Sequence, residues 1–304
     1  MQNITLEPVD LAFAEEITEL VIACDIDEYG QPDFVLEDLL DICSDIPLAT
    51  NSWMIRMNGE VTAFAFLEEN EKGRLSSYGY VHPKWKSQGL GSLLLEAIEN
   101  RAREYALDST ETACTLSNVI PALSEAARQL LENRGYVFQR KYSRMGIELQ
   151  TPPALSTPGN GISIDLYNPA ADEDLLWSAY CETFQDTRTY YEIDKSQWLK
   201  EKGGAHYDRN FWFIAHADNQ LAGFIISKNF GDHLYVDLLG VRRPWRKQGI
   251  ARALLEHVFH AAYNRGIEQV LLSVDDVSLT GANRLYEAVG MKALFQMAFY
   301  EKKL

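Results

Sequence analysis

Basic residues are missing from the start of this chain, because no lysine or arginine occurs between Met1 and Ile55. The whole sequence has 28 basic and 44 acidic residues, and residues 1–155 alone carry 25 acidic against 12 basic ones. Binding to nucleic acid requires a basic surface that neutralises phosphates, so the net charge of −16 argues against a DNA or RNA partner. The acidic half indicates either a solvated face or a surface that attracts a cationic amine.

Cysteine is scarce, and long apolar runs are absent. The four cysteines have neither CxxC nor Cys/His ligand spacing, so we expect reduced thiols and no metal site. No apolar run approaches the roughly 20 residues of a membrane-spanning helix, and the first residues do not resemble a signal peptide. We therefore expect a cytoplasmic protein with no membrane partner.

The length of 304 residues favours two domains. Between the halves lies QTPPALSTPGNG (150–161), an uncharged stretch with three prolines and two glycines, which is typical of a linker. The sequence thus predicts one domain at 1–150, a linker at 151–161 and a second domain at 162–304.

The two halves contain related sequences. The segment VHPKWKSQGLGSLLLE (81–96) aligns without gaps on VRRPWRKQGIARALLE (241–256), with seven of 16 positions identical. A period near 160 residues indicates domain duplication, since the units of solenoid repeats are about 20–50 residues long. We expect a pseudo-dimeric monomer, with a homodimer as the alternative.

The hydrophobic pattern predicts the same order of elements in each half. In the second half it predicts strands at 162–168, 233–241, 268–274 and 295–303, a hairpin at 211–227, and helices at 172–184, 194–203, 249–266 and 281–290. The expected fold class is α/β, with a mixed, mostly antiparallel sheet and a later strand–helix–strand crossover in each domain.

The duplicated segment places a short basic glycine loop between a strand and a helix. Unpaired amides and the positive end of the helix dipole make such a loop an anion site, so we expect a ligand that carries phosphate. A P-loop is disfavoured because Gly249 is followed by Ile250 and Ala251, and a dinucleotide fingerprint is disfavoured because Leu94 and Leu254 replace its third glycine.

The loops RKQGIA (246–251) and KSQGLG (86–91) resemble the phosphate loop of the GNAT superfamily of acyl-CoA-dependent N-acetyltransferases, which reads Arg/Gln-x-x-Gly-x-Gly/Ala. ANRLYEAVGM (282–291) is also similar to the family pattern, and the tandem layout is similar to that of its mycothiol synthase branch. The resemblance implies two tandem GNAT domains and acetyl-CoA as co-substrate, with no metal. The implied cofactor-binding residues are Leu239, Gly240, Val241, Arg246, Lys247, Gln248, Gly249, Ile250 and Ala251, and in the first half Lys86, Gln88, Gly89 and Gly91.

Acetyl transfer requires a proton acceptor for the amine, stabilisation of an oxyanion and a proton for the departing thiolate. The family pattern implies Tyr286 as the acid and Asp237 as the base, and strand alternation predicts Asp237 on the same face as Leu239 and Val241. Leu131 and Ser77 occupy the matching positions of the first half, which we therefore expect to be non-catalytic. Leu279 replaces an asparagine that is frequent in the family.

The expected function is an acetyl-CoA-dependent N-acetyltransferase that acts on a primary amine, most simply a small molecule or an amino-acid derivative, by direct attack in the second half. Alternatives are a non-catalytic acyl-CoA-binding or regulatory protein and a peptide or protein N-acetyltransferase. Glu182, Asp186, Tyr190 and Tyr191 are candidates for an aromatic and acidic acceptor wall, or for a solvated helical face.

Overall fold

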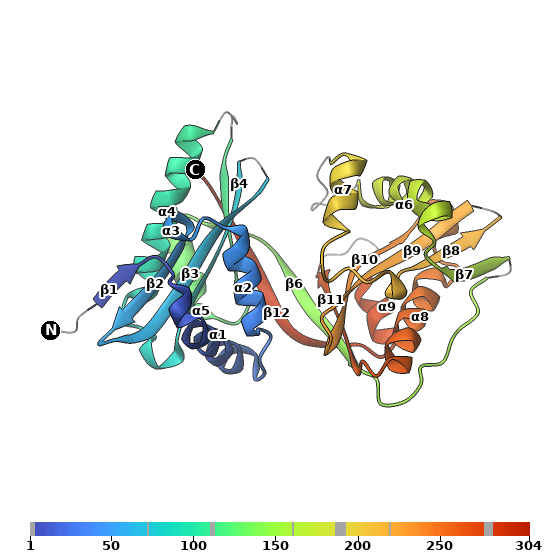
Figure 1. Cartoon of the computed structure of the whole chain (residues 1–304), viewed down its shortest axis with the longest axis horizontal. Coiled ribbons are helices and arrows are strands. Elements are labelled where there is room, and N and C mark those ends of the chain that lie inside the picture. Colours follow the sequence, from blue (N-terminus) through green and yellow to red (C-terminus); the bar gives the residue numbers. More distant parts are fainter. Residues whose placement is uncertain are drawn as a thin grey trace. The chain divides into compact units, whose positions relative to one another are not determined.

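The computed structural model describes residues 4–71, 73–109, 113–159, 161–185, 193–218, 220–276 and 282–304 (Figure 1). They form two compact units of α/β architecture. Unit 1 contains the chain up to Tyr142 together with Phe295–Leu304, and unit 2 contains Ser143–Leu294. No helix in the described ranges is long and apolar enough to cross a membrane.

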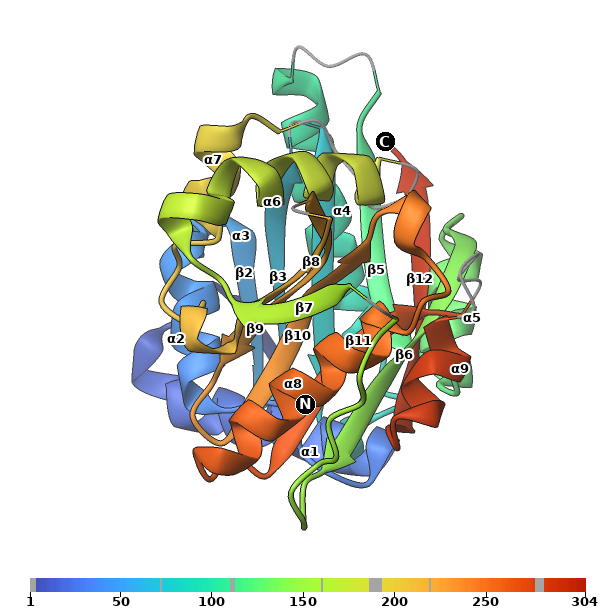
Figure 2. The same cartoon turned by 90° about the vertical axis from the view of Figure 1, so that its right-hand side faces the viewer.

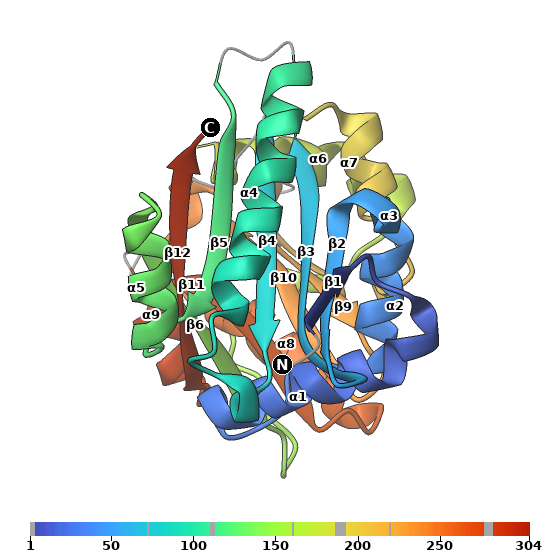
Figure 3. The ribbon, with the colours of Figure 1, turned by 90° about the vertical axis from the view of Figure 1, so that its left-hand side faces the viewer.

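Unit 1 consists of a mixed sheet with the strand order β1-β2-β3-β4-β5-β12 and helices packed on it. β4 and β5 pair in parallel, whereas β1–β2, β2–β3, β3–β4 and β5–β12 are antiparallel. Figure 3 shows α4 lying along one face of this sheet, with β12 beside β5. The elements are β1 (Ile4–Glu7), α1 (Ala14–Tyr29), α2 (Leu36–Asp45), α3 (Leu48–Asn51), β2 (Ser52–Met57), β3 (Glu60–Glu71), β4 (Arg74–Val81), α4 (Leu90–Asp108), β5 (Thr115–Pro121), α5 (Glu125–Asn133) and β12 (Lys292–Lys303).

Unit 2 repeats this plan with the strand order β6-β11-β10-β9-β8-β7, in which β10 and β11 are parallel. Its elements are β6 (Val137–Glu148), β7 (Ile162–Leu166), α6 (Pro169–Phe184), α7 (Lys195–Glu201), β8 (Phe213–Ala217), β9 (Gln220–Asn229), β10 (His233–Val241), α8 (Ile250–Asn264), β11 (Gln269–Asp275) and α9 (Ala282–Ala288). The order of elements predicted for residues 162–304, from β7 to β12, is confirmed.

Each face of the unit 2 sheet has its own apolar core. Leu254, Val258 and other residues at helical spacing on α8 pack against one face, in a core that includes Tyr286. Leu176 and Tyr180 of α6 pack against the other face with Phe224. Figures 1 and 2 show α6 and α8 on these two faces, so β10 is covered from both sides.

Two strands pass from one unit into the other, which the sequence did not predict. β6 begins in unit 1, but Met145 and the following Leu149 are buried in the core of unit 2. β12 begins in unit 2, but Ala298 and Tyr300 are buried in the core of unit 1. The bounds of the two compact units therefore fall within β6 and β12, because the last strand of each half completes the other unit.

Candidate active site

The predicted phosphate loop of unit 2 has an unusual backbone. Lys247 (φ 63°) and Gly249 (φ 81°) both lie in the left-handed region, which is uncommon for a lysine. Gly249 is the N-cap of α8, and residues 246–249 are exposed. Because the first amides of a helix have no intrahelical acceptor, this loop presents N–H groups and the positive helix end to an anion.

The strand that leads into the loop separates from its parallel neighbour. The β10–β11 pairing runs from His233–Gln269 to Val236–Leu272. Within the described part of the chain, residues 237–241 of β10 do not pair with β11. Backbone groups on that edge of residues 237–241, including the predicted Leu239, Gly240 and Val241, are thus available to a ligand.

Gly240 is also required by packing on the α6 side of this strand. A Cβ at this position would lie 2.6 Å from Cε1 of Phe224 and 2.9 Å from Oγ1 of Thr183. Any larger residue would therefore have to displace the Phe224 ring or the Thr183 side chain.

A β-bulge occurs at Asp237. On β9, Ser227 pairs with Val236 and the next residue, Ile226, pairs with Leu238, so Asp237 is the extra residue of β10. The prediction that Asp237 shares a face with Leu239 and Val241 is wrong, because the bulge breaks the alternation. Leu239 and Val241 pack on the α8 face, whereas Asp237 contacts residues on the α6–α7 face.

Asp237 is engaged by three polar side chains. Lys202 Nζ lies 2.8 Å from Asp237 Oδ2, Lys228 Nζ lies 3.5 Å from Oδ1, and the Tyr207 hydroxyl donates to Oδ2 at 2.9 Å. Burial alone would raise the pKa of Asp237, but the two ammonium groups and the hydroxyl outweigh it and hold this pKa below its usual value. Asp237 is therefore a carboxylate at neutral pH.

Tyr286 lies on α9 in the core of the α8 face, with 9% of its surface exposed. Burial, together with the nearby Tyr235, raises the pKa of Tyr286 to about 12. The phenol thus remains protonated and able to donate. The Leu279 position lies outside the described residues.

The predicted acceptor wall is described only in part. Glu182, near the end of α6, accepts from Arg242 Nε at 2.6 Å, so its carboxylate ties α6 to the end of β10. Asp186, Tyr190 and Tyr191 lie outside the described residues.

The segment predicted as a linker contacts the phosphate loop. The Gly159 amide donates to the Gln248 carbonyl at 3.2 Å. The Ser156 amide donates to Glu256 Oε2 at 2.6 Å, and Arg252 holds the other oxygen of Glu256 at 2.8 Å. We call residues 156–159 the linker strap, since they brace the loop and the first turns of α8.

The corresponding loop of unit 1 keeps the shape but not the electrostatics. Ser87 (φ 63°) and Gly89 (φ 80°) repeat the left-handed backbone, and Gln88 is exposed like Gln248. However, Lys86 Nζ lies 2.6 Å from Asp27 Oδ2 and 2.8 Å from Glu28 Oε1, at the end of α1. Two carboxylates at this loop disfavour a bound polyanion.

In unit 1, Ser77 and Leu131 occupy the positions that match Asp237 and Tyr286, and both make packing or hydrogen-bond contacts. Ser77, which aligns with Asp237, bridges β4 and β5 through the Ser117 carbonyl and the Asn118 amide, and the pairing around it has no bulge. Leu131, which matches Tyr286, is 3% exposed in an apolar core. Gly91 allows close packing, since a Cβ there would lie 3.3 Å from Leu130 Cδ2.

The partners of Asp237 are not among the residues that the sequence predicts for the site. Lys228 could have been predicted as a site residue, because it is the one charged residue of LAGFIISKN (221–229), a strand that is otherwise largely apolar. Lys202 and Tyr207 lie in an irregular segment after α7, where no periodicity predicts which side chains face the strand.

Comparison with known proteins identifies the family of this chain. The model of the acetyltransferase (GNAT) family matches residues 14–136 and again 173–291, so the chain belongs to the GNAT family and is an acetyltransferase. It is 28% identical over 243 residues to a mycothiol acetyltransferase of Thermobispora bispora, covering 76% of each chain. A mycothiol acetyltransferase of Saccharopolyspora erythraea is 26% identical over 265 residues, covering 83% of this chain and 86% of the relative.

Two solved structures have the same tandem fold. A GCN5-related N-acetyltransferase from Sphaerobacter thermophilus superposes with a TM-score of 0.91 at 30% identity, covering 99% of this chain and 95% of the other. A tandem GNAT protein from the clavulanic acid biosynthesis pathway superposes with a TM-score of 0.75 at 14% identity, covering 99% and 98%. The predicted family and two-domain GNAT fold are thus confirmed.

Proposed function

We propose that unit 2 transfers an acetyl group from acetyl-CoA to a primary amine by direct attack, and that unit 1 is not catalytic. The observation that carries this proposal is the set of features at β10: a left-handed anion loop, an unpaired strand edge and a bulged carboxylate, with a protonated phenol on α9. In the described residues of unit 1 the loop shape and the strand separation recur, whereas Ser77 and Leu131 stand at the positions that match Asp237 and Tyr286.

Each part of unit 2 has a role in this proposal. Acetyl-CoA supplies the acyl thioester. The amides of residues 249–251 hold its pyrophosphate, and the open edge of β10 holds the pantetheine and polarises the carbonyl. Asp237 accepts the proton of the amine, directly or through water, and Tyr286 donates its proton to the departing sulfur.

Release of CoA measured with a panel of primary amines tests the reaction. Loss of an essential acid or base costs about 10²-fold or more in rate, so Tyr286→Phe and Asp237→Asn should each lower kcat by that factor. Thermal stabilisation by acetyl-CoA tests binding separately. Stabilisation without turnover of any amine or peptide would favour a non-catalytic acyl-CoA-binding protein, and turnover of peptides alone would favour a protein N-acetyltransferase.

A further inference from the structure

Among the residues that the structure describes, the ionic cluster around Asp237 contains more positive than negative charge. Lys202 and Lys228 both approach this carboxylate, and each ammonium also lies 4.9 Å from the centre of the Tyr207 ring. The cluster thus consists, in the described part of unit 2, of two cations that share one anion and one aromatic ring.

Burial makes this imbalance costly. The side chains of Lys202, Asp237 and Lys228 are 13%, 17% and 29% exposed. A charge that is largely removed from water needs a partner of opposite sign. Lys202 Nζ lies 2.8 Å from Asp237 Oδ2, whereas Lys228 Nζ lies 3.5 Å from Oδ1. Lys228 is therefore the ammonium that is more available to a second anion.

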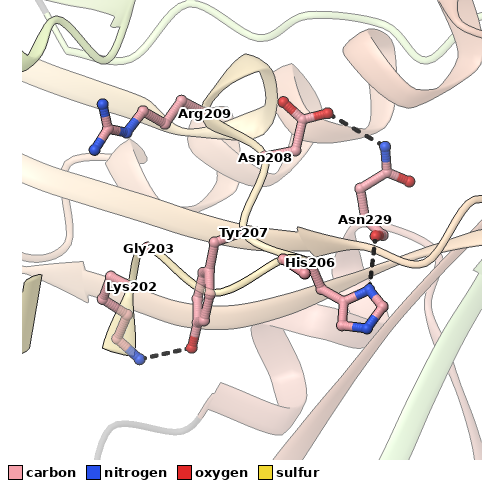
Figure 4. Close-up of a pocket in the computed structure, with 8 residues that line it drawn as sticks. Lys202, Gly203, His206, Tyr207, Asp208, Arg209 and Asn229 are labelled. Atoms are coloured by element: carbon pink, nitrogen blue, oxygen red, sulfur yellow. Dashed lines mark hydrogen bonds between the residues drawn. The ribbon is translucent and has the colours of Figure 1, made fainter. Parts of the chain in front are cut away.

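A cavity of about 440 Å³ adjoins the cluster at Lys202 (Figure 4). This volume lies within the range of small-molecule sites, about 300–1,000 Å³. Its wall includes Arg209, His206 and Asn229, while its acidic residue, Asp208, accepts from the Asn229 and Asn210 side chains. The lining therefore adds cationic and hydrogen-bonding groups beside Lys202, while Lys228 lies in the adjoining cluster.

We propose that the acceptor amine carries an anionic group, a carboxylate or a phosphate, which binds at Lys202 and Lys228. This inference rests on the proposed N-acetyltransferase function and adds the class of acceptor. An ammonium alone would meet a cluster with excess positive charge, whereas an acceptor with both charges places its anion at the lysines and its amine near Asp237.

Matched acceptors test the proposal. L-Amino acids are assayed beside their own amides, and phosphoethanolamine beside ethanolamine, each with acetyl-CoA and the full chain. We expect kcat/KM to be at least tenfold higher for the anionic member of one of these series. The two series distinguish carboxylate from phosphate.

Lys228→Gln is the informative variant, because Asp237 retains Lys202 and Tyr207. We expect it to remove most of the preference for the anionic acceptor, with the KM for acetyl-CoA unchanged. Lys200→Gln, which removes an exposed lysine of α7, should retain the preference.

Calorimetric titration of the same pairs into the CoA-loaded protein gives a readout that does not depend on turnover. The inference would be overturned if both members of every pair bind and react equally well. A higher kcat/KM for diamines than for the anionic acceptors would also overturn it, as would an unchanged preference in Lys228→Gln. In each of those cases the N-acetyltransferase proposal would stand, provided that an amine without an anionic group is still acetylated. Failure of acetyl-CoA to bind would instead reject that proposal.

Discussion

Gly89 and Gly249 adopt the same left-handed backbone, φ 80° and 81°, at the N-caps of α4 and α8. The two positions therefore impose the same conformational strain on any substituted residue, although their surroundings differ. Near Gly89, Lys86 is paired with two carboxylates of α1, and near Gly249 the linker strap braces the loop.

This pair provides a matched test of which unit binds acetyl-CoA. Gly249→Asp places a negative charge where the pyrophosphate is expected, so the Kd of acetyl-CoA should rise by at least tenfold. Gly89→Asp carries the same strain and charge and should leave the Kd within about twofold. Calorimetry on both variants measures this, and equal weakening by the two would show that unit 1 contributes to binding.

Tyr286 should act as an acid over an unusually wide pH range. Its pKa is raised to about 12 by burial, so the phenol stays protonated well above the ordinary tyrosine value of about 10. We expect kcat to show no alkaline loss between pH 8 and about pH 10 that depends on this residue. Comparing the pH profile of kcat with that of Tyr286→Phe checks this, and a limb near pH 9 that disappears in the variant would contradict it.

The ion pairs of Asp237 should stabilise the fold in a pH-dependent way. Because the pKa of Asp237 is lowered in the folded protein, its contribution is present above the unfolded value of about 3.9 and is lost as the pH falls through the folded value. Removing one partner of a buried pair costs about 3 kcal/mol, so Asp237→Asn should lower the Tm at pH 7 and lower it less near pH 3.

Asp174→Asn is the control for that measurement. Asp174 pairs with Lys195, but its side chain is 92% exposed, and exposed pairs contribute about 0–1 kcal/mol. Its Tm should change little at either pH. A destabilisation by Asp237→Asn that is the same at pH 7 and pH 3 would mean that packing, not charge, holds Asp237.

The linker strap should affect affinity for acetyl-CoA without affecting the chemical step. Glu256→Ala removes the acceptor for the Ser156 amide, and a lost hydrogen bond of about 1 kcal/mol corresponds to roughly a fivefold weaker Kd if the loop loosens. Glu96→Ala changes the aligned residue of α4, whose side chain is 61% exposed, and should have no effect. A Glu256→Ala protein with unchanged Kd and unchanged Tm would show that the strap is passive.

The stability of unit 1 should depend on residues 295–304 at the carboxyl end of the chain. Deleting residues 295–304 removes Ala298 and Tyr300 from its core and leaves β5 without its antiparallel partner. We expect unit 1 peptides to lose hydrogen-exchange protection by several orders of magnitude, while peptides of α8 and β9 in unit 2 stay protected. Uniform loss across both units, or none, would contradict this expectation.

The sequence predicted much of the fold because its signals are local. The helical spacing of Leu254, Leu255 and Val258 and the turn after Val241 are enough to place α8 and the loop. The bulge at Asp237 could not be predicted, because it depends on how β9 and β10 pair and not on either strand alone. The surroundings of Glu182 and Asp237 could not be predicted either. No local pattern indicates that Arg242 donates a hydrogen bond to Glu182, or that lysines approach Asp237.

The exchange of final strands has a consequence for the history of the gene. A chain consisting of residues 1–150 would lack β12, and one consisting of 162–304 would lack β6, so neither open reading frame alone encodes a complete domain. Recombination at the proline-rich segment would therefore separate two unfinished products. The first half, with Leu131 and Ser77 at the positions that match Tyr286 and Asp237, therefore still supplies the strand β6 to the sheet of unit 2.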